Sequence, residues 1–165
     1  MVITLTGFMG CGKSSVGEEL ARLLSFRFCD LDAYIVHKAG KDIPAIFAEN
    51  PERFRALEAE AVRDNIIMSE IEGFDLVLAL GGGALMNPEV EKLVLGHSRC
   101  VYLETSLEAL QERLEGCCDR PLLGTKSIAD LFEERRPGYE KAGLKVGTDG
   151  RTPGQVAQDI FRLLA

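Results

Sequence analysis

The sequence predicts an α/β three-layer sandwich, in which helices cover both faces of a central parallel sheet of about five strands. Short β-rich segments alternate along the chain with stretches whose apolar residues recur at helical spacing, a pattern typical of such sheets. Hydrophobic residues make up 46% of the 165 residues, enough for one sizeable core. We therefore expect residues 1–165 to form a single domain.

Each expected strand is a short run of β-branched and apolar residues bounded by turn or polar residues. In chain order these runs are residues 2–5, 26–29, 76–80, 100–103 and 144–146. The expected helices carry apolar residues three or four positions apart, so each presents one apolar stripe to the sheet. They cover residues 16–24, 54–62, 107–114, 128–132 and 156–164.

Charge and composition exclude several classes of protein. Twenty-six Asp and Glu against nineteen Lys and Arg give a net charge of -7, the wrong sign for a sequence-independent nucleic-acid binder. The longest apolar stretches, such as residues 76–80, are far shorter than the ~20 residues of a membrane span. Five cysteines without metal-ligand spacing fit reduced thiols. We expect a cytoplasmic protein with neither a nucleic-acid nor a membrane partner.

Residues 7–14, Gly-Phe-Met-Gly-Cys-Gly-Lys-Ser, match G-x-x-x-x-G-K-[ST] between the first expected strand and the first expected helix. In such a P-loop, the glycines let backbone N–H groups and a helix N-terminus face nucleotide phosphates. Lys13 would reach the β and γ oxygens, and the Ser14 hydroxyl would bind Mg²⁺. The loop residues expected to contact the nucleotide are Gly10, Cys11, Gly12, Lys13, Ser14 and Ser15. A dinucleotide fingerprint fits less well, because Ser15 occupies its third glycine position.

An acidic pair follows the second expected strand. Asp30 and Asp32 would share one side of the chain if the backbone stayed extended, beside the phosphates and able to organise a metal or accept a proton. A solvated turn is the alternative interpretation. The apolar strand 76–80 ends in glycines rather than in an acid, and no Asn-Lys-x-Asp sequence is present. Both observations favour a small-molecule kinase over a GTPase.

At this point the chain resembles the shikimate kinase family over essentially its full length. The resemblance rests on a succession of motifs, of which the P-loop is the least specific. They are residues 7–14, Phe-Cys-Asp-Leu-Asp at 28–32, Phe-Arg-Ala-Leu-Glu at 54–58, Gly-Gly-Gly-Ala at 81–84, Arg-Pro-Leu-Leu at 120–123 and Arg-Arg-Pro-Gly-Tyr at 135–139.

The resemblance implies roles for particular residues. Asp32 would hold the attacking shikimate hydroxyl and take its proton, while Asp30 would help order Mg²⁺ through water. Arg55 and Arg135 would bind the shikimate carboxylate, which guanidinium forks suit geometrically. The pocket wall would be formed by Gly81, Gly82 and Gly83, whose backbone can approach a hydroxylated ring closely.

For the nucleotide, the resemblance implies a lid over about residues 115–126, from which Arg120 would close on the transferring phosphate. Arg113, Arg151 and Pro153 match positions where the family sandwiches the adenine of ATP. With Lys13 and Asp32, Arg120 completes the expected catalytic set.

Simpler interpretations stay open for both acceptor arginines. Arg55 would be solvated at the surface or paired with Glu58 three residues later, and that pair would also suit an arginine oriented for binding. Arg135 lies on the apolar face of its helix, and an arginine that snorkels past the core would look the same. Arg136 competes for its role; the family spacing Arg-x-Pro-x-Tyr selects Arg135.

The expected reaction is transfer of the ATP γ-phosphoryl to the 3-hydroxyl of shikimate, in chorismate and aromatic amino-acid synthesis, by a monomer that requires Mg²⁺. A gluconate or nucleotide kinase is the nearest alternative, since it would share the P-loop and the lid. A nucleotide-binding regulatory module without catalysis is the alternative from a different class. The intact Lys13, Ser14, Asp32 and Arg120 argue against that module.

Overall fold

The computed structural model describes residues 1–114 and 127–165. Within these ranges, five parallel strands form one sheet in the order β2-β3-β1-β4-β5. The strands are β1 (Val2–Thr6), β2 (Arg27–Asp30), β3 (Leu76–Ala79), β4 (Arg99–Glu104) and β5 (Leu144–Gly147). This confirms the predicted parallel sheet and places each strand within a residue or two of its expected position.

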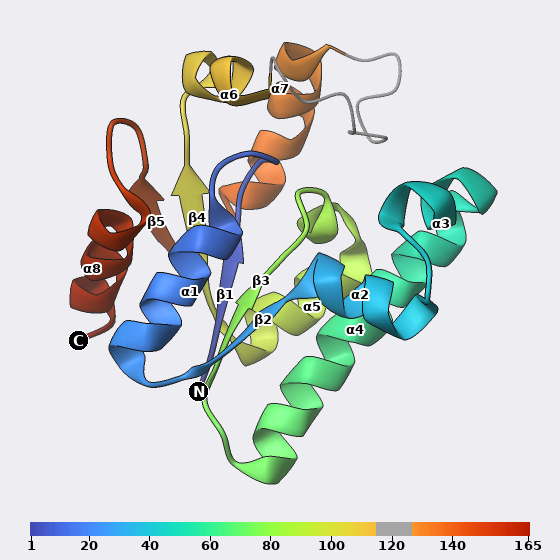
Figure 1. Ribbon diagram of the computed structural model, residues 1–165, viewed down its shortest axis with the longest axis horizontal. Helices are drawn as coiled ribbons and strands as arrows, with labels where there is room; N and C mark the ends of the chain where they lie inside the picture. The colour runs from blue at the N-terminus through green and yellow to red at the C-terminus, as the bar shows by residue number, and fades with distance from the viewer. Residues whose placement is uncertain (115–126) are drawn as a thin grey trace.

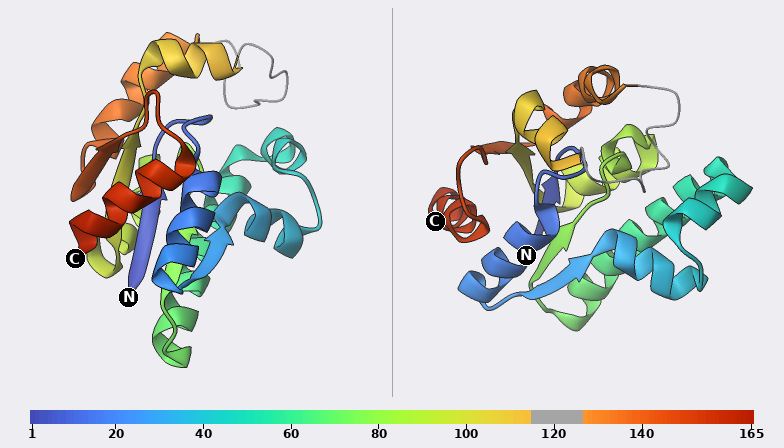
Figure 2. Two further views of the ribbon diagram at one scale, coloured as in Figure 1. Left: turned by 60° about the vertical axis from the view of Figure 1, so that its left-hand side comes forward. Right: turned by 45° about the horizontal axis from the view of Figure 1, so that its top comes forward.

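The helices lie on both faces of the sheet, as predicted (Figures 1 and 2). They are α1 (Lys13–Leu24), α2 (Leu31–Ala39), α3 (Ile43–Glu49), α4 (Pro51–Glu72), α5 (Pro88–His97), α6 (Leu107–Leu114), α7 (Ile128–Tyr139) and α8 (Pro153–Leu164), with the 3₁₀ turn η1 (Ala84–Met86). Of these, α2, α3 and α5 were not expected from the apolar spacing.

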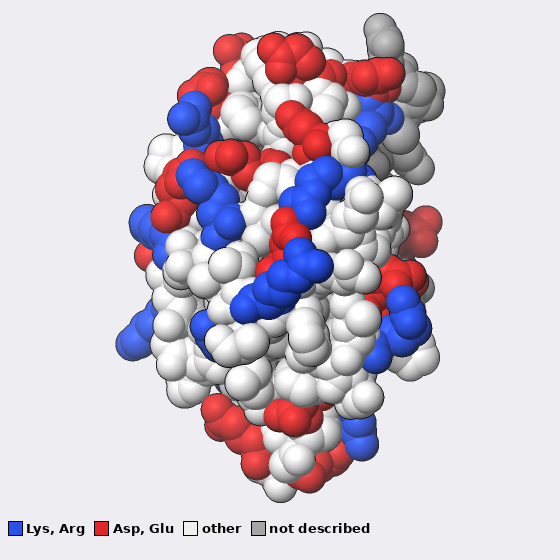
Figure 3. All heavy atoms as spheres, turned by 90° about the vertical axis from the view of Figure 1, so that its left-hand side faces the viewer, with Lys and Arg blue, Asp and Glu red and all other residues white. Residues whose placement is uncertain are grey.

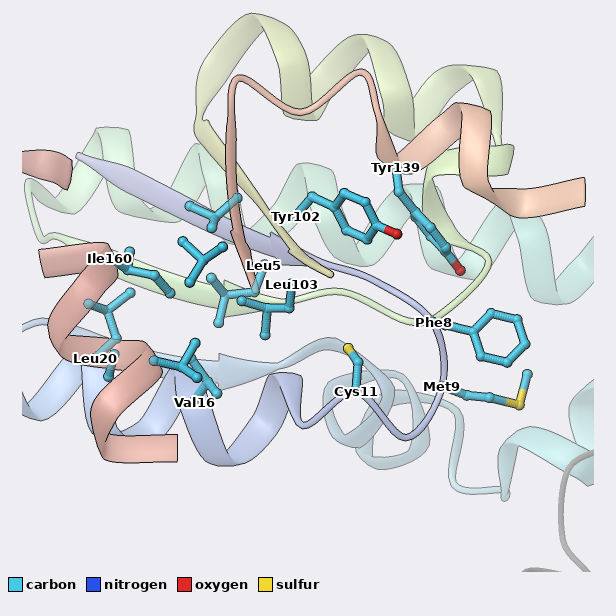
Figure 4. Packing of buried hydrophobic residues seen from close by; sticks show 14 of the residues in the cluster. Leu5, Phe8, Met9, Cys11, Val16, Leu20, Tyr102, Leu103, Tyr139 and Ile160 are labelled. Atoms are coloured by element: carbon cyan, nitrogen blue, oxygen red, sulfur yellow. The ribbon is translucent and has the colours of Figure 1, made fainter. Parts of the chain in front are cut away.

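Two apolar clusters, one on each face, hold the layers together. Ile3 and Leu5 of the central strand β1 pack with Leu20 of α1 and Ile160 of α8, whereas Val2 packs with the cluster that α4 and α5 cover. Alternate residues of β1 therefore serve opposite faces, which is what strand geometry requires of a sheet buried on both sides. Figure 4 shows Leu5, Leu20 and Ile160 in the cluster under α1 and α8.

The carboxyl ends of three neighbouring strands position the candidate site. β1 runs into the glycine-rich loop before α1, β2 ends at Asp30, and β3 leads through Leu80 to the glycines at 81–83. Since parallel strands end at the same edge of a sheet, segments far apart in sequence meet there.

The chain turns directly from β2 into α2, which corrects one premise of the sequence analysis. Asp30 is the last residue of β2 and the N-cap of α2, whereas Asp32 lies in the first turn of that helix. The backbone is therefore not extended across the pair, because the Asp30 carboxylate accepts the Ala33 N–H at 3.1 Å and starts the helix.

The charged surface is mixed. On the face that carries α8 and β5, Lys and Arg side chains are interspersed with Asp and Glu (Figure 3). In the part of the chain that the structure describes, no helix has both the length and the apolar character needed to cross a bilayer.

Candidate active site

The glycine-rich loop has the backbone that a phosphate cradle needs. Gly10 and Gly12 have φ of 83° and 91°, in the left-handed region that side chains disfavour, and Gly12 is the N-cap of α1. The amine of Lys13 donates to the carbonyls of Gly7 at 2.8 Å and Phe8 at 3.1 Å, so the cation lies over the loop. The helix N-terminus and the amine together form an anion site.

Cys11 is buried, and its thiol points from the loop toward the apolar cluster under α1 (Figure 4). Its side chain therefore fills space in the core. Any contact of Cys11 with a phosphate would come from its backbone.

A pocket of about 260 Å³ lies beside this loop. Its lining comes from the P-loop, the acidic pair and the glycine wall, and consists of Met9, Gly10, Gly12, Lys13, Ser14, Ser15, Asp30, Asp32, Leu80, Gly81 and Gly82. The P-loop, the acidic pair and two glycines of the expected wall thus line one cavity, which Asp32 reaches from the first turn of α2. Gly83 is not part of this lining.

Ser14 and Asp30 form the part of this pocket that suits Mg²⁺. The Ser14 hydroxyl donates to the Asp30 carboxylate, and both oxygens lie at the N-terminal end of α1. Among the described residues no group of three or more His, Cys, Asp or Glu side chains could hold a metal. Two oxygen donors fit Mg²⁺, which keeps several waters and takes further ligands from nucleotide phosphates.

The two predicted acceptor arginines meet at Gly83. A Cβ atom there would stand 3.1 Å from Nη2 of Arg55 and 3.2 Å from Nη2 of Arg135, so only a glycine leaves both groups where they are. Arg135 is 4% exposed, and its Nη1 is buried without a hydrogen-bond partner among the described residues. A buried cation with an unused donor costs free energy and is suited to receive an anion.

Arg55 is held by a buried carboxylate. Its Nη1 donates to Glu58 at 3.0 Å and to the Gly83 carbonyl at 3.2 Å, and Glu58 is only 1% exposed. Burial raises the pKa of Glu58 above its ordinary value; Arg55 opposes this shift and Asp32 adds to it. Arg55 therefore forms the ion pair with Glu58 and at the same time extends toward Gly83, so the pairing does not exclude a role in binding the acceptor.

Helix α7 carries Arg135 into the site. Tyr139, one turn later, donates its hydroxyl to the Gly82 carbonyl at 2.5 Å, and burial raises its pKa, so it stays a neutral donor. Its ring packs on Tyr102, and Arg135 lies 5.9 Å from the centre of the Phe8 ring. Figure 4 shows Tyr102 and Tyr139 next to each other, with Phe8 extending from the loop near Tyr139.

Arg136, the competing residue, points to solvent. Its side chain is 52% exposed and lies within 4.0 Å of the carboxylates of Glu133 and Glu140 on its own helix. The choice of Arg135 made from the motif spacing therefore agrees with burial.

The residues expected around adenine are only partly assembled. Arg113 donates to the Gly10 carbonyl at 2.9 Å, so α6 lies over the P-loop. Arg151 forms an ion pair with Asp159 at 2.5 Å and lines a different pocket of about 460 Å³, and Pro153 is the first residue of α8. Arg120 and the expected lid lie outside the described residues.

One contact at the site was missed by the sequence analysis. Asn87 donates to the Arg55 carbonyl at 2.9 Å, which ties the segment after the glycines to α4. Its sequence signal, an asparagine before a proline, predicts only a helix N-cap.

The P-loop on a parallel sheet, with an acidic pair in its pocket and two arginines that meet at the neighbouring strand end, is the arrangement of a P-loop kinase. The chain belongs to the shikimate kinase family, whose model matches residues 9–165.

Relatives and solved structures agree with that assignment. A shikimate kinase of Thermus thermophilus is 46% identical across 98% of this chain and 89% of its own length, and that of Geobacter sulfurreducens 42% across 96% and 87%. The structure of shikimate kinase from Acinetobacter baumannii in complex with shikimate has a TM-score of 0.90 at 33% identity, covering 99% of this chain and 92% of that one. Shikimate kinase from Aquifex aeolicus has a TM-score of 0.84 at 35% identity, covering 99% and 96%.

Proposed function

We propose that this chain transfers the γ-phosphoryl group of ATP to the 3-hydroxyl of shikimate, giving shikimate 3-phosphate and ADP. The observation that supports the proposal most is the buried Arg135, whose Nη1 has no hydrogen-bond partner in the described part of the chain. Arg135 meets Arg55 at Gly83, next to the two glycines that line the phosphate pocket. A ring acid bound there would direct its carboxylate to the arginines and its hydroxyls toward Asp32.

In the proposed mechanism, Asp32 aligns the attacking hydroxyl and takes its proton, and Lys13 neutralises charge on the β and γ oxygens. Phosphoryl transfer depends on alignment and charge more than on a strong base, so a carboxylate suffices. Ser14 and Asp30 would hold Mg²⁺, Asp30 through water, and that ion would supply charge neutralisation at the phosphates.

Arg120 is proposed to approach the transferring phosphate from a lid over about residues 115–126, as the family resemblance implies. Arg113, Arg151 and Pro153 are proposed to contact adenine. Support for this is strongest for Arg113, whose guanidinium group contacts the P-loop. We further propose a cytoplasmic monomer, in keeping with a biosynthetic enzyme that acts on small molecules.

An acceptor panel tests the proposal. ADP release is measured with shikimate, gluconate and nucleoside monophosphates in parallel, each with ATP and Mg²⁺. Turnover with shikimate alone is expected. Turnover with gluconate or a nucleotide instead would assign a different small-molecule kinase, and tight ATP binding without turnover of any acceptor would point to a regulatory module.

A further inference from the structure

Asn87 lies where three elements meet. It follows η1 directly, and its Oδ1 caps α5 by accepting the Glu89 N–H at 3.2 Å. Its Nδ2 donates to the backbone carbonyl of Arg55 in α4 at 2.9 Å. An N-cap needs only the side-chain oxygen, so the amide donor serves a separate contact.

That contact completes a two-point attachment of Arg55. The guanidinium tip donates to the Gly83 carbonyl at 3.2 Å, and the backbone carbonyl of the same residue accepts from Asn87. Gly83 and Asn87 flank η1, so this short turn holds Arg55 at both ends. Asn87 also lies beside Glu58, the carboxylate that pairs with Arg55, and favours its charged form.

The two acceptor arginines differ in how much they depend on such support. Arg135 is buried and packed, whereas the Arg55 side chain is 31% exposed and can move toward solvent. Because Arg135 is fixed by packing, the distance between the two guanidinium groups depends on where Arg55 is held. That in turn depends on the position of α4 relative to the glycine wall. Asn87 joins the α4 backbone to the segment directly after that wall, and the Arg63–Glu89 ion pair joins the same helix to α5 two residues further on.

We propose that Asn87 is a positioning residue for the acceptor carboxylate, acting through Arg55, an inference that rests on the proposed function. Removal of its amide donor frees the first turns of α4 and lets Arg55 leave Gly83. The proposed nucleotide contacts, which come from the P-loop, Arg113, Arg120, Arg151 and Pro153, do not involve Asn87 or α4 and should be unaffected.

Asn87→Asp tests this with little change in shape. Aspartate caps a helix as well as asparagine does, but it cannot donate to the Arg55 carbonyl. We expect the KM for shikimate to rise by at least about fivefold to tenfold, as for one lost hydrogen bond, while the KM for ATP stays near wild type. The melting temperature should fall in this variant, because the new carboxylate lies beside the buried Glu58. Asn87→Ser, which also keeps a cap oxygen, serves as the second variant.

Asn50→Asp is the matched control. Asn50 caps α4 through the same oxygen contact, accepting from the N–H groups of Glu52 and Arg53, so this change places the same charge at a neighbouring helix start. We expect its shikimate KM to stay within about twofold of wild type, as for a retained cap.

A double-mutant cycle separates positioning from general damage. In an Arg55→Ala background, Asn87→Asp is expected to raise the shikimate KM no further, because both changes act through the same group. An equal rise in both backgrounds, equal effects on ATP and shikimate, or an unchanged shikimate KM would overturn the inference. If the wild type phosphorylates shikimate and Asn87→Asp matches it, only this inference fails; if the wild type does not phosphorylate shikimate, the proposed function and the inference fail together.

Discussion

The guanidinium groups of Arg55 and Arg135, carried by α4 and α7, come together at Gly83, with one Nη2 atom of each within 3.2 Å of the position that a Cβ would occupy. Two like charges this close repel each other. Glu58 offsets the charge of Arg55, whereas Nη1 of Arg135 has no hydrogen-bond partner among residues 1–114 and 127–165. A carboxylate bound between them would use that nitrogen and reduce the repulsion.

Gly83→Ala would test this convergence. The added Cβ would press on both arginines, and the partly exposed Arg55 would yield because Arg135 is buried. We expect a rise in the KM for shikimate of roughly tenfold, equal to about 1.4 kcal/mol of binding, with the KM for ATP unchanged. Gly96→Ala in α5, where a Cβ meets open space, is the control, and identical kinetics of the two variants would argue against the arrangement.

Arg135→Met separates function from stability. An apolar side chain of similar length removes a buried charge whose Nη1 has no partner among the described residues, so the melting temperature of the substrate-free protein should stay constant or rise. The affinity for shikimate should fall by about 2–4 kcal/mol, as for a buried charge partner, and shikimate should no longer raise the melting temperature. Arg55→Met should weaken binding less, because its side chain is partly exposed. A large drop in the melting temperature of substrate-free Arg135→Met would show that Arg135 is structural.

Asp32→Asn addresses the chemical step. The amide keeps the shape of the side chain but cannot accept the hydroxyl proton, so kcat should fall by on the order of 10² to 10⁴, with a modest change in ATP affinity. Single-turnover kinetics with saturating shikimate measure this directly. Unaltered turnover would remove Asp32 from the mechanism.

Glu58 should give the stability of the protein a characteristic pH dependence. Its pKa is raised above the ordinary 4.5, so the unfolded chain releases the proton first. Wild type should therefore lose stability relative to Glu58→Gln as pH rises above about 4.5 toward the raised pKa. Urea unfolding between about pH 4 and 7 measures the difference.

Glu49→Gln provides the opposite trend as a control. Lys41 lowers the pKa of Glu49, so its contribution to stability is present above the ordinary 4.5 and is lost as pH falls through the lowered pKa. If Glu58 behaved like Glu49, the burial argument for Glu58 would be wrong.

Local patterns were enough to predict the strands and the P-loop. β1, β3 and β4 are largely buried runs rich in apolar residues. The spacing of the glycines, Lys13 and Ser14 indicates a phosphate-binding loop directly, because each of these residues has a known part in holding phosphates. Arg135 was selected from a motif, and its burial on the apolar face of α7 agrees with that choice.

Contacts between distant segments could not be predicted in the same way. Asp30 and Asp32 would share one side of an extended chain, but the backbone there is helical because one capping hydrogen bond starts α2. The sequence around Asn87 predicts only a helix N-cap. Its hydrogen bond to the Arg55 carbonyl exists because η1 packs against α4, which the local sequence does not indicate. The meeting of both arginines at Gly83 likewise depends on packing between α4, α7 and the end of β3.

The position of phosphorylation tests the central claim most directly. Product made from ATP and shikimate is examined by phosphorus-to-proton correlation NMR, which identifies the ring hydroxyl that carries the new phosphate. The arginine-anchored carboxylate and Asp32 predict a single product, phosphorylated at the 3-hydroxyl. Phosphate at another hydroxyl, or no phosphorylated shikimate while gluconate or a nucleotide is consumed, would contradict the account.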